Sequence, residues 1–237
     1  MSSHTIFTDL GLIPYSEALD FQQKLFDELI HLKILNESLP QCEKLASYNH
    51  LIFCEHPHVY TLGKSGDESN LLIDAIQLKA NNADFVKTNR GGDITYHGPG
   101  QLVGYPILDL EDMQLGTRQY IEKMEEAIIQ TLGDYGIISY KKNDAIGVWL
   151  AANENESERK IAAIGVKISR AVSMHGFALN VNTNLDYFNY INPCGFIDKG
   201  VTSIEKEIGF TPDYEVLKMK IKQNLAKKLS LSFYEMS

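Results

Sequence analysis

The sequence predicts an α+β fold with a mixed β-sheet flanked by helices, and three features of the chain support this prediction. Helix-like and strand-like segments are both frequent, but they do not alternate strictly as in a doubly wound fold. The length of 237 residues is enough for one substantial hydrophobic core. The sequence has no internal repeat, low-complexity segment or Pro/Ser-rich linker. We therefore expect residues 1–237 to form a single domain.

Apolar periodicity predicts the elements of the first half. Residues 16–38 are expected to form an amphipathic helix, because apolar residues recur there at spacings of three and four. That stripe consists of Phe21, Leu25, Leu29 and Leu32. Further along, strands are expected at residues 51–53, 59–62 and 85–88, a loop at residues 63–67 and a short helix at residues 71–79.

The second half begins with an apolar run at residues 102–110, which predicts a buried strand. A helix is expected over residues 117–135, with Ile121, Met124, Ile128 and Leu132 on one face. Strands are expected at residues 146–150, 161–168 and 176–181. A last helix is expected over residues 212–230, with an apolar stripe of Val216, Met219, Ile221 and Leu225.

Composition excludes several classes of protein. No apolar run approaches the roughly 18 residues that span a bilayer, and the N-terminus lacks the pattern of a signal peptide. Three cysteines argue against a disulfide framework and favour a reducing, cytoplasmic location. The net charge of −9 argues against non-specific binding of nucleic acid.

Residues 90–101 are the most informative segment of the chain. Their sequence is Arg90-Gly91-Gly92-Asp93-Ile94-Thr95-Tyr96-His97-Gly98-Pro99-Gly100-Gln101. Glycines leave backbone N–H groups uncovered and allow close approach of a ligand, and arginine supplies a forked hydrogen-bond donor. The segment precedes a strand, so it predicts a ligand-binding loop. It has neither the Lys-Ser/Thr ending of a P-loop nor a following helix, which argues against a triphosphate site.

Cys194 is the strongest candidate for a nucleophile. It lies between Pro193 and Gly195, which places it on a turn rather than in a packed core. A catalytic cysteine must ionise, so it needs a positive neighbour or a helix N-terminus. The alternative, an inert cysteine in a turn, stays open on the residues alone.

Three residues are candidates for general acid–base catalysis: Lys160, His97 and His175. Lys160 begins a strand of small and aliphatic residues, where partial desolvation favours proton transfer. A solvated lysine at a strand end is the alternative. Either histidine can activate a thiol, and either can instead be a hydrogen-bonded structural residue. Cys54, His56 and His58 have the residue types of a zinc site, but Pro57 interrupts the strand, and we expect no metal.

Four ordered segments resemble the lipoyl(octanoyl) transferase family of lipoate biosynthesis, within the biotin/lipoate protein ligase superfamily. They are residues 90–101, Lys160-Ile161-Ala162-Ala163-Ile164-Gly165, His175-Gly176-Phe177-Ala178-Leu179-Asn180 and Ile191-Asn192-Pro193-Cys194-Gly195. The segment Glu55-His56-Pro57 with Tyr60-Thr61-Leu62-Gly63 also fits. Residues 1–45 and 206–237 contribute no motif. The acidic run at residues 153–158 is longer than the resemblance leads us to expect, and we assign it no role.

The resemblance implies an acyltransferase domain with the fold of biotin and lipoate protein ligases. It implies transfer of an octanoyl group from octanoyl-acyl carrier protein to a lysine of lipoyl domains, those of 2-oxoacid dehydrogenases and the glycine cleavage H protein. Cys194 takes the place of the nucleophile that carries the acyl group as a thioester, and Lys160 that of the lysine that lowers its pKa. No cofactor is implied. The residues implied to line the acyl site are Arg90, Gly91, Gly92, Asp93, Ile94, Thr95, Tyr96, His97, Ala163, Ile164, Gly165, Gly176, Phe177 and Ala178.

Three other functions remain as alternatives. The first is an ATP-dependent lipoate ligase of the same fold, and the second is a non-catalytic protein that binds acyl carriers or lipoyl domains. The third is a cysteine hydrolase that uses His175 as its base. Because acyl carrier proteins are acidic, we also expect a basic docking face near the active site. Its expected members are Lys141, Lys142, Arg159, Lys160, Lys167 and Arg170.

Overall fold

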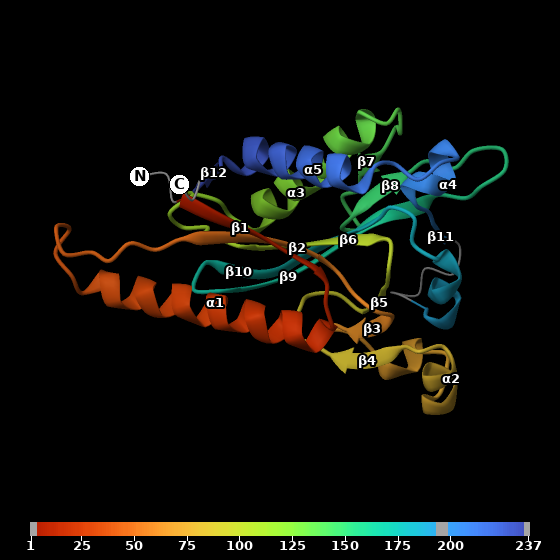
Figure 1. Ribbon diagram of the computed structural model, residues 1–237, viewed down its shortest axis with the longest axis horizontal. Coiled ribbons are helices and arrows are strands. Elements are labelled where there is room, and N and C mark those ends of the chain that lie inside the picture. The colour runs from red at the N-terminus through yellow and green to blue at the C-terminus, as the bar shows by residue number, and fades with distance from the viewer. Residues whose placement is uncertain (1–3, 193–198, 235–237) are drawn as a thin grey trace.

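The computed structural model describes residues 4–192 and 199–234, in which helices cover both faces of a central mixed sheet (Figure 1). Within these residues the central sheet contains nine strands. They are β1 (His4–Leu12), β2 (Asn49–Glu55), β6 (Gln101–Ile107), β7 (Tyr140–Lys141), β8 (Val148–Leu150), β9 (Arg159–Ser169), β10 (Val172–Asn180), β11 (Gly200–Val201) and β12 (Ser232–Phe233).

A second sheet and the helices complete the described part of the chain. The second sheet contains β3 (Val59–Leu62), β4 (Asp84–Lys87) and β5 (Ile94–His97), in the order β4-β3-β5. It lies near the N-terminal end of the longest helix (Figure 1). The helices are α1 (Tyr15–Glu37), α2 (Ala75–Ala80), α3 (Thr117–Gly133), α4 (Ile204–Ile208) and α5 (Tyr214–Leu229), with short 3-10 turns η1 (Glu68–Asn70) and η2 (Leu185–Tyr190).

The strand order β12-β1-β2-β6-β10-β9-β8-β7 contains both parallel and antiparallel pairs. β1 pairs in parallel with β12 and β2, whereas β2, β6, β10, β9 and β8 form an antiparallel series. β11 adds a short parallel pair to β9. The predicted mixed sheet flanked by helices is therefore confirmed.

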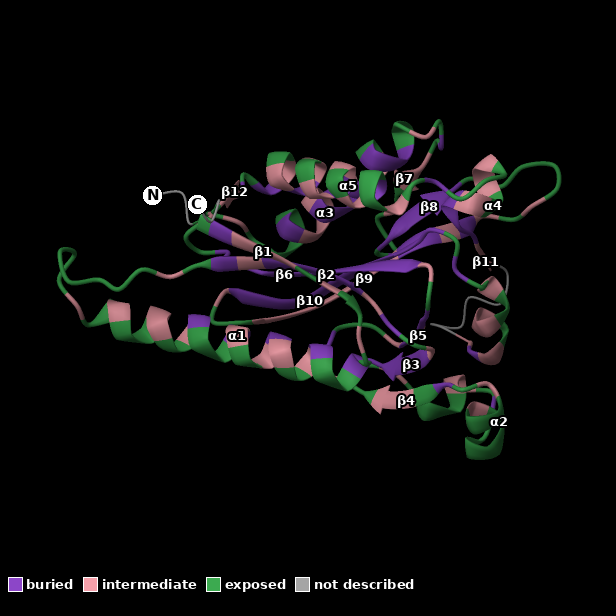
Figure 2. Ribbon diagram, viewed as in Figure 1, coloured by how far each residue is buried: buried purple, intermediate pink, exposed green. Residues whose placement is uncertain are grey.

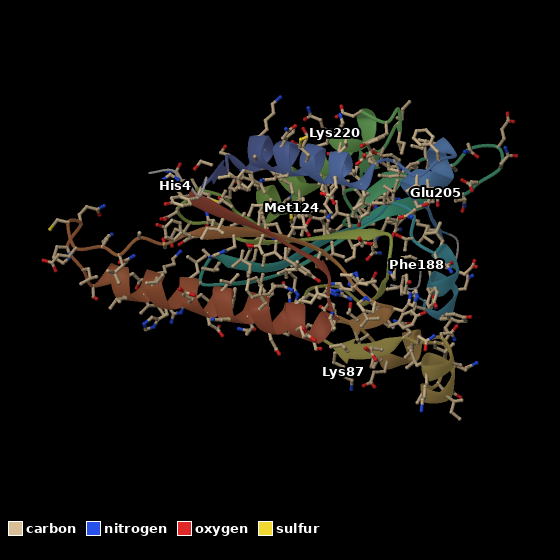
Figure 3. The ribbon with its side chains drawn as sticks, in the orientation of Figure 1. His4, Lys87, Met124, Phe188, Glu205 and Lys220 are labelled. Carbon is tan, nitrogen blue, oxygen red and sulfur yellow. The ribbon has the colours of Figure 1, made fainter. Side chains whose placement is uncertain are left out.

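Alternation along the strands divides the core between the two faces of the central sheet. Leu51 and Phe53 of β2 face α3 and α5, and Ile52 and Cys54 face α1. Figure 2 shows buried strands between helices whose outer sides are exposed. Met124 of α3, labelled in Figure 3, is fully buried in the core between that helix and the sheet.

The structure corrects two of the predicted apolar stripes. The buried residues of α1 are Tyr15, Ala18, Gln22, Phe26 and Leu29, so only Leu29 of the expected stripe is fully buried. The buried residues of α5 are Leu217, Ile221, Leu225 and Leu229, spaced by four, whereas Val216 and Met219 are exposed. Each helix carries more apolar residues than its buried face can hold, so spacing alone selects the wrong set.

Several element boundaries also differ from the prediction, and two of the differences have a clear local cause. The expected helix at residues 71–79 begins only at Ala75, because Asp74 caps it and accepts from the N–H groups of Ile76 and Gln77. The expected strand at residues 146–150 begins at Val148, because Gly147 has a φ of 127° that a strand residue does not adopt. Strands β1, β5, β7, β11 and β12 are absent from the prediction. Of these, β5 lies within residues 90–101, which the sequence predicts to be a loop.

Candidate functional site

The segments that the sequence singles out meet at one cavity of about 1120 Å³, which lies between the central sheet, the second sheet and the glycine-rich loop between β4 and β5 (residues 88–93). The expected residues that line it are Lys160, Arg90, Gly91, Gly92, Asp93, Ile94, Thr95, His97, Ala163, Ile164, Gly165, Gly176, Phe177 and Ala178. Phe188 of η2, labelled in Figure 3, also lines it.

The expectation for Tyr96 is corrected. Its neighbours Thr95 and His97 line the cavity, but Tyr96 is fully buried on the other side of β5. Its hydroxyl lies 2.7 Å from Nδ1 of His58, and its ring stacks on that of Tyr187 with centroids 5.0 Å apart. Side chains alternate along a strand, so a continuous motif cannot place all its residues in one wall.

Small residues form the floor of the cavity. In the antiparallel pair of β9 and β10, Gly165 lies opposite Gly176 and Ala163 lies opposite Ala178. Gly176 is also needed for packing, since a Cβ there would lie 2.1 Å from the backbone oxygen of Gly104. The two glycines let neighbouring backbone pack directly on the sheet, and the small side chains of Ala163 and Ala178 line the cavity beside them.

The glycine-rich loop forms the wall opposite this floor. The N–H of Gly91 donates to the carbonyl oxygen of Val166 at 2.9 Å, which ties the loop to β9. A Cβ at Gly165 would lie 2.9 Å from the carbonyl oxygen of Gly91, so the loop and strand approach more closely than a side chain permits. The glycines therefore allow the loop to pack directly on β9 at this edge of the cavity.

Arg90 holds this wall to the second sheet. The guanidinium donates to the carbonyl oxygen of Thr61 at 2.6 Å, to its Oγ1 at 2.9 Å, and to the carbonyl oxygen of Gly91 at 3.1 Å. Arg90 is only 8% exposed. Its hydrogen bonds fix the glycine-rich loop, so part of its role is structural even though it lines the cavity.

A hydrogen-bonded chain continues from Arg90 across four strands. Oγ1 of Thr61 lies 3.4 Å from Nε2 of His97, and Nδ1 of His97 lies 2.8 Å from Oε1 of Gln101. Nε2 of Gln101 donates to Oδ1 of Asn180 at 2.9 Å, and Nδ2 of Asn180 donates to the carbonyl oxygen of Thr202. The Gln101 oxygen requires a proton on Nδ1 of His97. Burial, followed by the charge of His56, lowers the pKa of His97 to about 3, so the ring is neutral.

Lys160 lies at the opposite end of the cavity floor from the glycine-rich loop. Its ammonium nitrogen is 4.6 Å from the centroid of the Trp149 ring, which attracts a cation through its π face. Its aliphatic stem rests on Gly147, where a Cβ would lie 3.3 Å from Cε of Lys160. The buried carboxylate of Glu125 accepts from the N–H of Gly147 at 2.9 Å and so supports the turn beneath Lys160.

Cys194 belongs to residues 193–198 and lies outside the described residues. The described residues on either side, Asn192 and Lys199, both line the cavity. The N–H of Asn192 donates to the carbonyl oxygen of Asn70 at 2.8 Å, which fixes the chain on one side. On the other side, the N–H of Thr202 donates to the carbonyl oxygen of Lys160 at 2.9 Å. The described residues on both sides of residues 193–198 therefore lie at the cavity that Lys160 also lines.

His175 lines the cavity near the glycine-rich loop, away from Lys160. It has a φ of 62°, and its Nε2 lies 2.8 Å from Oδ1 of Asn89. Burial, with the charges of Arg90 and Lys167, lowers its pKa to about 3. A base with that pKa accepts protons poorly near neutral pH, which argues against the hydrolase alternative.

The expected basic docking face is corrected at Arg159. This residue is 5% exposed, and its guanidinium binds both carboxylate oxygens of Glu207 at 2.7 Å. Glu156 and Glu158, from the acidic run, also form ion pairs: Glu156 with Arg159 and Lys206, and Glu158 with Lys142 and Lys199. The acidic run therefore neutralises basic residues near Lys160, a role that composition does not reveal.

Cys54 and His56 are close together, but both are buried and their contacts are part of the core. Nδ1 of His56 lies 2.8 Å from the carbonyl oxygen of Ile13, and its Nε2 lies 2.7 Å from the hydroxyl of Tyr105. His58 points to Tyr96 instead. Within residues 4–192 and 199–234, no three His, Cys, Asp or Glu side chains are grouped so that they can hold a metal ion. In the same residues, no helix is long and apolar enough to cross a membrane.

Sequence reasoning missed several residues of the cavity, including Trp149, Tyr15, Tyr105 and Asn180. Trp149 is the single tryptophan of the chain, and this feature of the sequence could have marked it as a candidate site residue. Tyr15 and Tyr105 lie in ordinary amphipathic and apolar segments. Their proximity depends on the packing of α1 against the sheet, which no local pattern shows.

Comparisons with known proteins agree with this architecture. A family model described as the lipoyl protein ligase A/B catalytic domain matches residues 14–226. An octanoyltransferase of Bacteroides fragilis is 51% identical over 95% of this chain and 98% of that protein. One from Cytophaga hutchinsonii is 50% identical over 94% of this chain and 91% of that protein.

Solved structures give the same result for the fold. A crystal structure of lipoate-protein ligase A bound with ATP has a TM-score of 0.68 at 15% identity, and the match covers 100% of this chain and 89% of that chain. A bipartite lipoate protein ligase from Thermoplasma acidophilum has a TM-score of 0.67 at 16% identity, with 99% and 87% covered. These similarities confirm the expected fold class.

Proposed function

Since the chain belongs to the lipoyl protein ligase A/B catalytic domain family, we propose that it transfers an octanoyl group to proteins through a thioester on Cys194. The donor is octanoyl-acyl carrier protein, and the acceptor is a lysine of a lipoyl domain, such as those of 2-oxoacid dehydrogenases or the glycine cleavage H protein. The reaction takes place in the cytoplasm, where the thiol stays reduced.

One observation carries this proposal. The Lys160 ammonium and both described neighbours of the Cys194 segment, Asn192 and Lys199, line the same cavity. An ammonium close to a thiol favours the thiolate, which is the nucleophilic form. The apolar side chains of Ala163 and Ala178 in the cavity wall suit an unbranched acyl chain, for which each buried CH₂ contributes about 0.8 kcal/mol.

The proposed reaction has two half-reactions. The Cys194 thiolate attacks the octanoyl thioester, a bond from its sulfur to the acyl carbon forms, and the bond to the carrier sulfur breaks. The leaving thiolate takes a proton from Lys160. Neutral Lys160 then accepts a proton from the acceptor lysine as that amine attacks the acyl carbon and Cys194 leaves as a thiolate.

These half-reactions need no nucleotide to drive them. Exchange of one thioester for another is nearly balanced, and conversion of a thioester to an amide is favourable. A covalent intermediate also allows two large protein partners to bind one after the other. This distinguishes the proposal from an ATP-dependent ligase, which must first activate a carboxylate.

The experiment is intact-mass spectrometry after incubation with octanoyl-acyl carrier protein and no ATP. We expect one octanoyl adduct, lost in Cys194→Ser and discharged when a lipoyl domain is added. Cys42→Ser, which changes an exposed cysteine, is the matched control and should keep the adduct. An adduct that survives Cys194→Ser, or transfer that requires ATP, would refute the proposal.

A further inference from the structure

A cluster of ammonium groups lies at the edge of the central sheet, around the ring of Trp149. In the strand register Trp149 of β8 is paired with Lys160 of β9 on one side and with Tyr140 of β7 on the other. The ring centroid lies 4.6 Å from Nζ of Lys160, 5.3 Å from Nζ of Lys142 and 5.2 Å from Nζ of Lys199. Three cations therefore share one indole ring, which attracts each of them through its π face.

One carboxylate holds two of these ammonium groups. Oε2 of Glu158 lies 2.7 Å from Nζ of Lys142 and 2.9 Å from Nζ of Lys199. The other oxygen, Oε1, accepts a hydrogen bond from the hydroxyl of Tyr140. Because two ammonium groups this close repel each other, an anion between them is strongly favoured. The three donors therefore converge on one point that suits a negatively charged oxygen.

The carboxylate comes from a segment that the proposed reaction does not use. Glu158 is the last residue of the acidic run at residues 153–158. Its carbonyl oxygen accepts from the N–H of Gly200 at 3.0 Å, which fixes the backbone, but its side chain is 23% exposed. Ion pairs that are open to solvent are weak, so this side chain can rotate into the solvent when another anion takes its place. Glu158 is thus a replaceable occupant of the site.

The three donors lie at the rim of the cavity. Lys199 and Lys160 line the cavity, whereas Lys142 and Glu158 are not among the lining residues. Lys199 therefore connects the cavity to the partly exposed carboxylate of Glu158. Asp144 also lines the cavity, and its charge acts on Lys142. A ligand that enters the cavity at the Lys160 end passes this group of charges.

Building on the proposed octanoyl transfer, we propose that Lys142, Lys199 and Tyr140 form a phosphate-binding subsite for the acyl donor, and that Glu158 competes with the donor for it. An acyl carrier protein holds its acyl group on a phosphopantetheine arm, and the phosphodiester is the one charged group of that arm. It carries a single negative charge, as the Glu158 carboxylate does, so the exchange leaves the local charge unchanged. Its two unesterified oxygens can accept from both ammonium groups and the hydroxyl.

The single tryptophan of the chain makes binding at this subsite measurable. Trp149 is 1% exposed, and two of the proposed donors lie beside its ring, so exchange of the anion should alter its fluorescence. The probes are pantetheine 4′-phosphate, pantetheine and inorganic phosphate, each titrated into the full chain in the presence of a reductant. We expect pantetheine 4′-phosphate to bind more tightly than pantetheine by roughly tenfold or more in Kd, and inorganic phosphate to compete with it.

Two substitutions should change this affinity in opposite directions. Lys142→Met removes one donor and should weaken the binding of pantetheine 4′-phosphate by roughly fivefold or more. Glu158→Gln removes the competing charge and should tighten binding by roughly 2- to 25-fold, the range that corresponds to two partly exposed ion pairs. A carboxylate with a purely structural role predicts no such gain. The matched controls are the exposed Lys24→Met on α1 and Glu154→Gln in the same acidic run, and both should keep the original affinity.

Acylation rates show whether the subsite serves the reaction. The value of kcat/KM for octanoyl-pantetheine 4′-phosphate, divided by that for octanoyl-pantetheine, gives a phosphate preference that does not depend on the amount of active protein. We expect a preference of roughly tenfold or more, which decreases in Lys142→Met and increases in Glu158→Gln. Should either variant fail to fold, the preference of the unaltered protein decides the question alone.

Three results would overturn one part of this reasoning each. Equal affinities and equal acylation rates with and without the phosphate would remove the subsite and leave the proposed function intact. Weaker binding of pantetheine 4′-phosphate in folded Glu158→Gln would show that this carboxylate organises the donors and does not compete for them. Phosphate-dependent binding without any acyl-enzyme would keep the phosphate subsite and overturn the octanoyl transfer.

Discussion

Three buried neutral histidines should make the folded protein sensitive to acid. Burial lowers the pKa of His56 to about 4, and of His97 and His175 to about 3. An imidazole in an unfolded chain has a pKa of about 6.5. Between these values the unfolded state binds protons that the folded state does not, so falling pH favours unfolding.

The magnitude follows from the difference in proton binding. Each pKa unit corresponds to about 1.4 kcal/mol, and pH 5 lies about 1.5 units below the unfolded pKa. Between pH 7 and pH 5, each histidine should lower the free energy of unfolding by about 2 kcal/mol, and the three together by about 5–6 kcal/mol. The loss begins as the pH falls through about 6.5 and is complete below the folded pKa values. A typical domain is stable by only about 5–15 kcal/mol, so this is a large fraction.

Urea unfolding at pH 7 and pH 5 measures this difference. His97→Gln and His175→Asn should each reduce the pH dependence by about 2 kcal/mol, because neither replacement titrates in this range. Asparagine also tolerates the left-handed backbone of residue 175. The exposed His31→Asn is the control for replacing a histidine outside the core. Equal stability at the two pH values would refute the reasoning.

Three further substitutions test the support of the site and the core. Glu125→Leu removes the acceptor of the Gly147 N–H, so it should lower the free energy of unfolding by about 1–3 kcal/mol and slow single-turnover acylation. Glu125→Gln keeps an acceptor and is the control. Equal acylation rates in the two variants would contradict the role of this hydrogen bond. Gly165→Val should abolish octanoyl transfer in a protein with an unchanged circular dichroism spectrum, because a Cβ there lies 2.9 Å from the Gly91 oxygen; activity close to the original would contradict that packing. Met124→Ala should lower the unfolding free energy by about 2–5 kcal/mol in urea, and the exposed Met219→Ala by less than about 0.5 kcal/mol; similar losses would contradict the assigned helix faces.

The sequence predicts the mixed fold and most long elements because their signals are local. The helices α1, α3 and α5 and the strands β6 and β9 fall close to where apolar periodicity places them, whereas β10 begins four residues before the predicted strand. Strand β1 is missing from the prediction because its extended conformation depends on pairing with β2 and β12, which are distant in sequence. The exposed Val216 and Met219 show a related limit: which apolar face of a helix is buried depends on its partner.

In the candidate site, too, features with a local signal are predicted and features that depend on distant residues are not. Glycine-rich and small-residue motifs identify the loop and the floor, because close backbone approach demands those residue types. The motif wrongly places Tyr96 in the cavity wall, because a continuous motif does not show the alternation of side chains along β5. The buried state of Arg159 depends on Glu207, which lies 48 residues away, and no spacing rule reports such a pair.

The two ends of the cavity are coupled by the hydrogen-bonded chain that begins at Arg90. That chain passes through His97 and Asn180 to Thr202, whose N–H donates to the carbonyl oxygen of Lys160. Each internal member donates and accepts, so moving one member leaves a buried polar group unsatisfied at its neighbour. The positions of Arg90 and of Lys160, at the two ends of the cavity, are therefore fixed relative to each other by polar contacts.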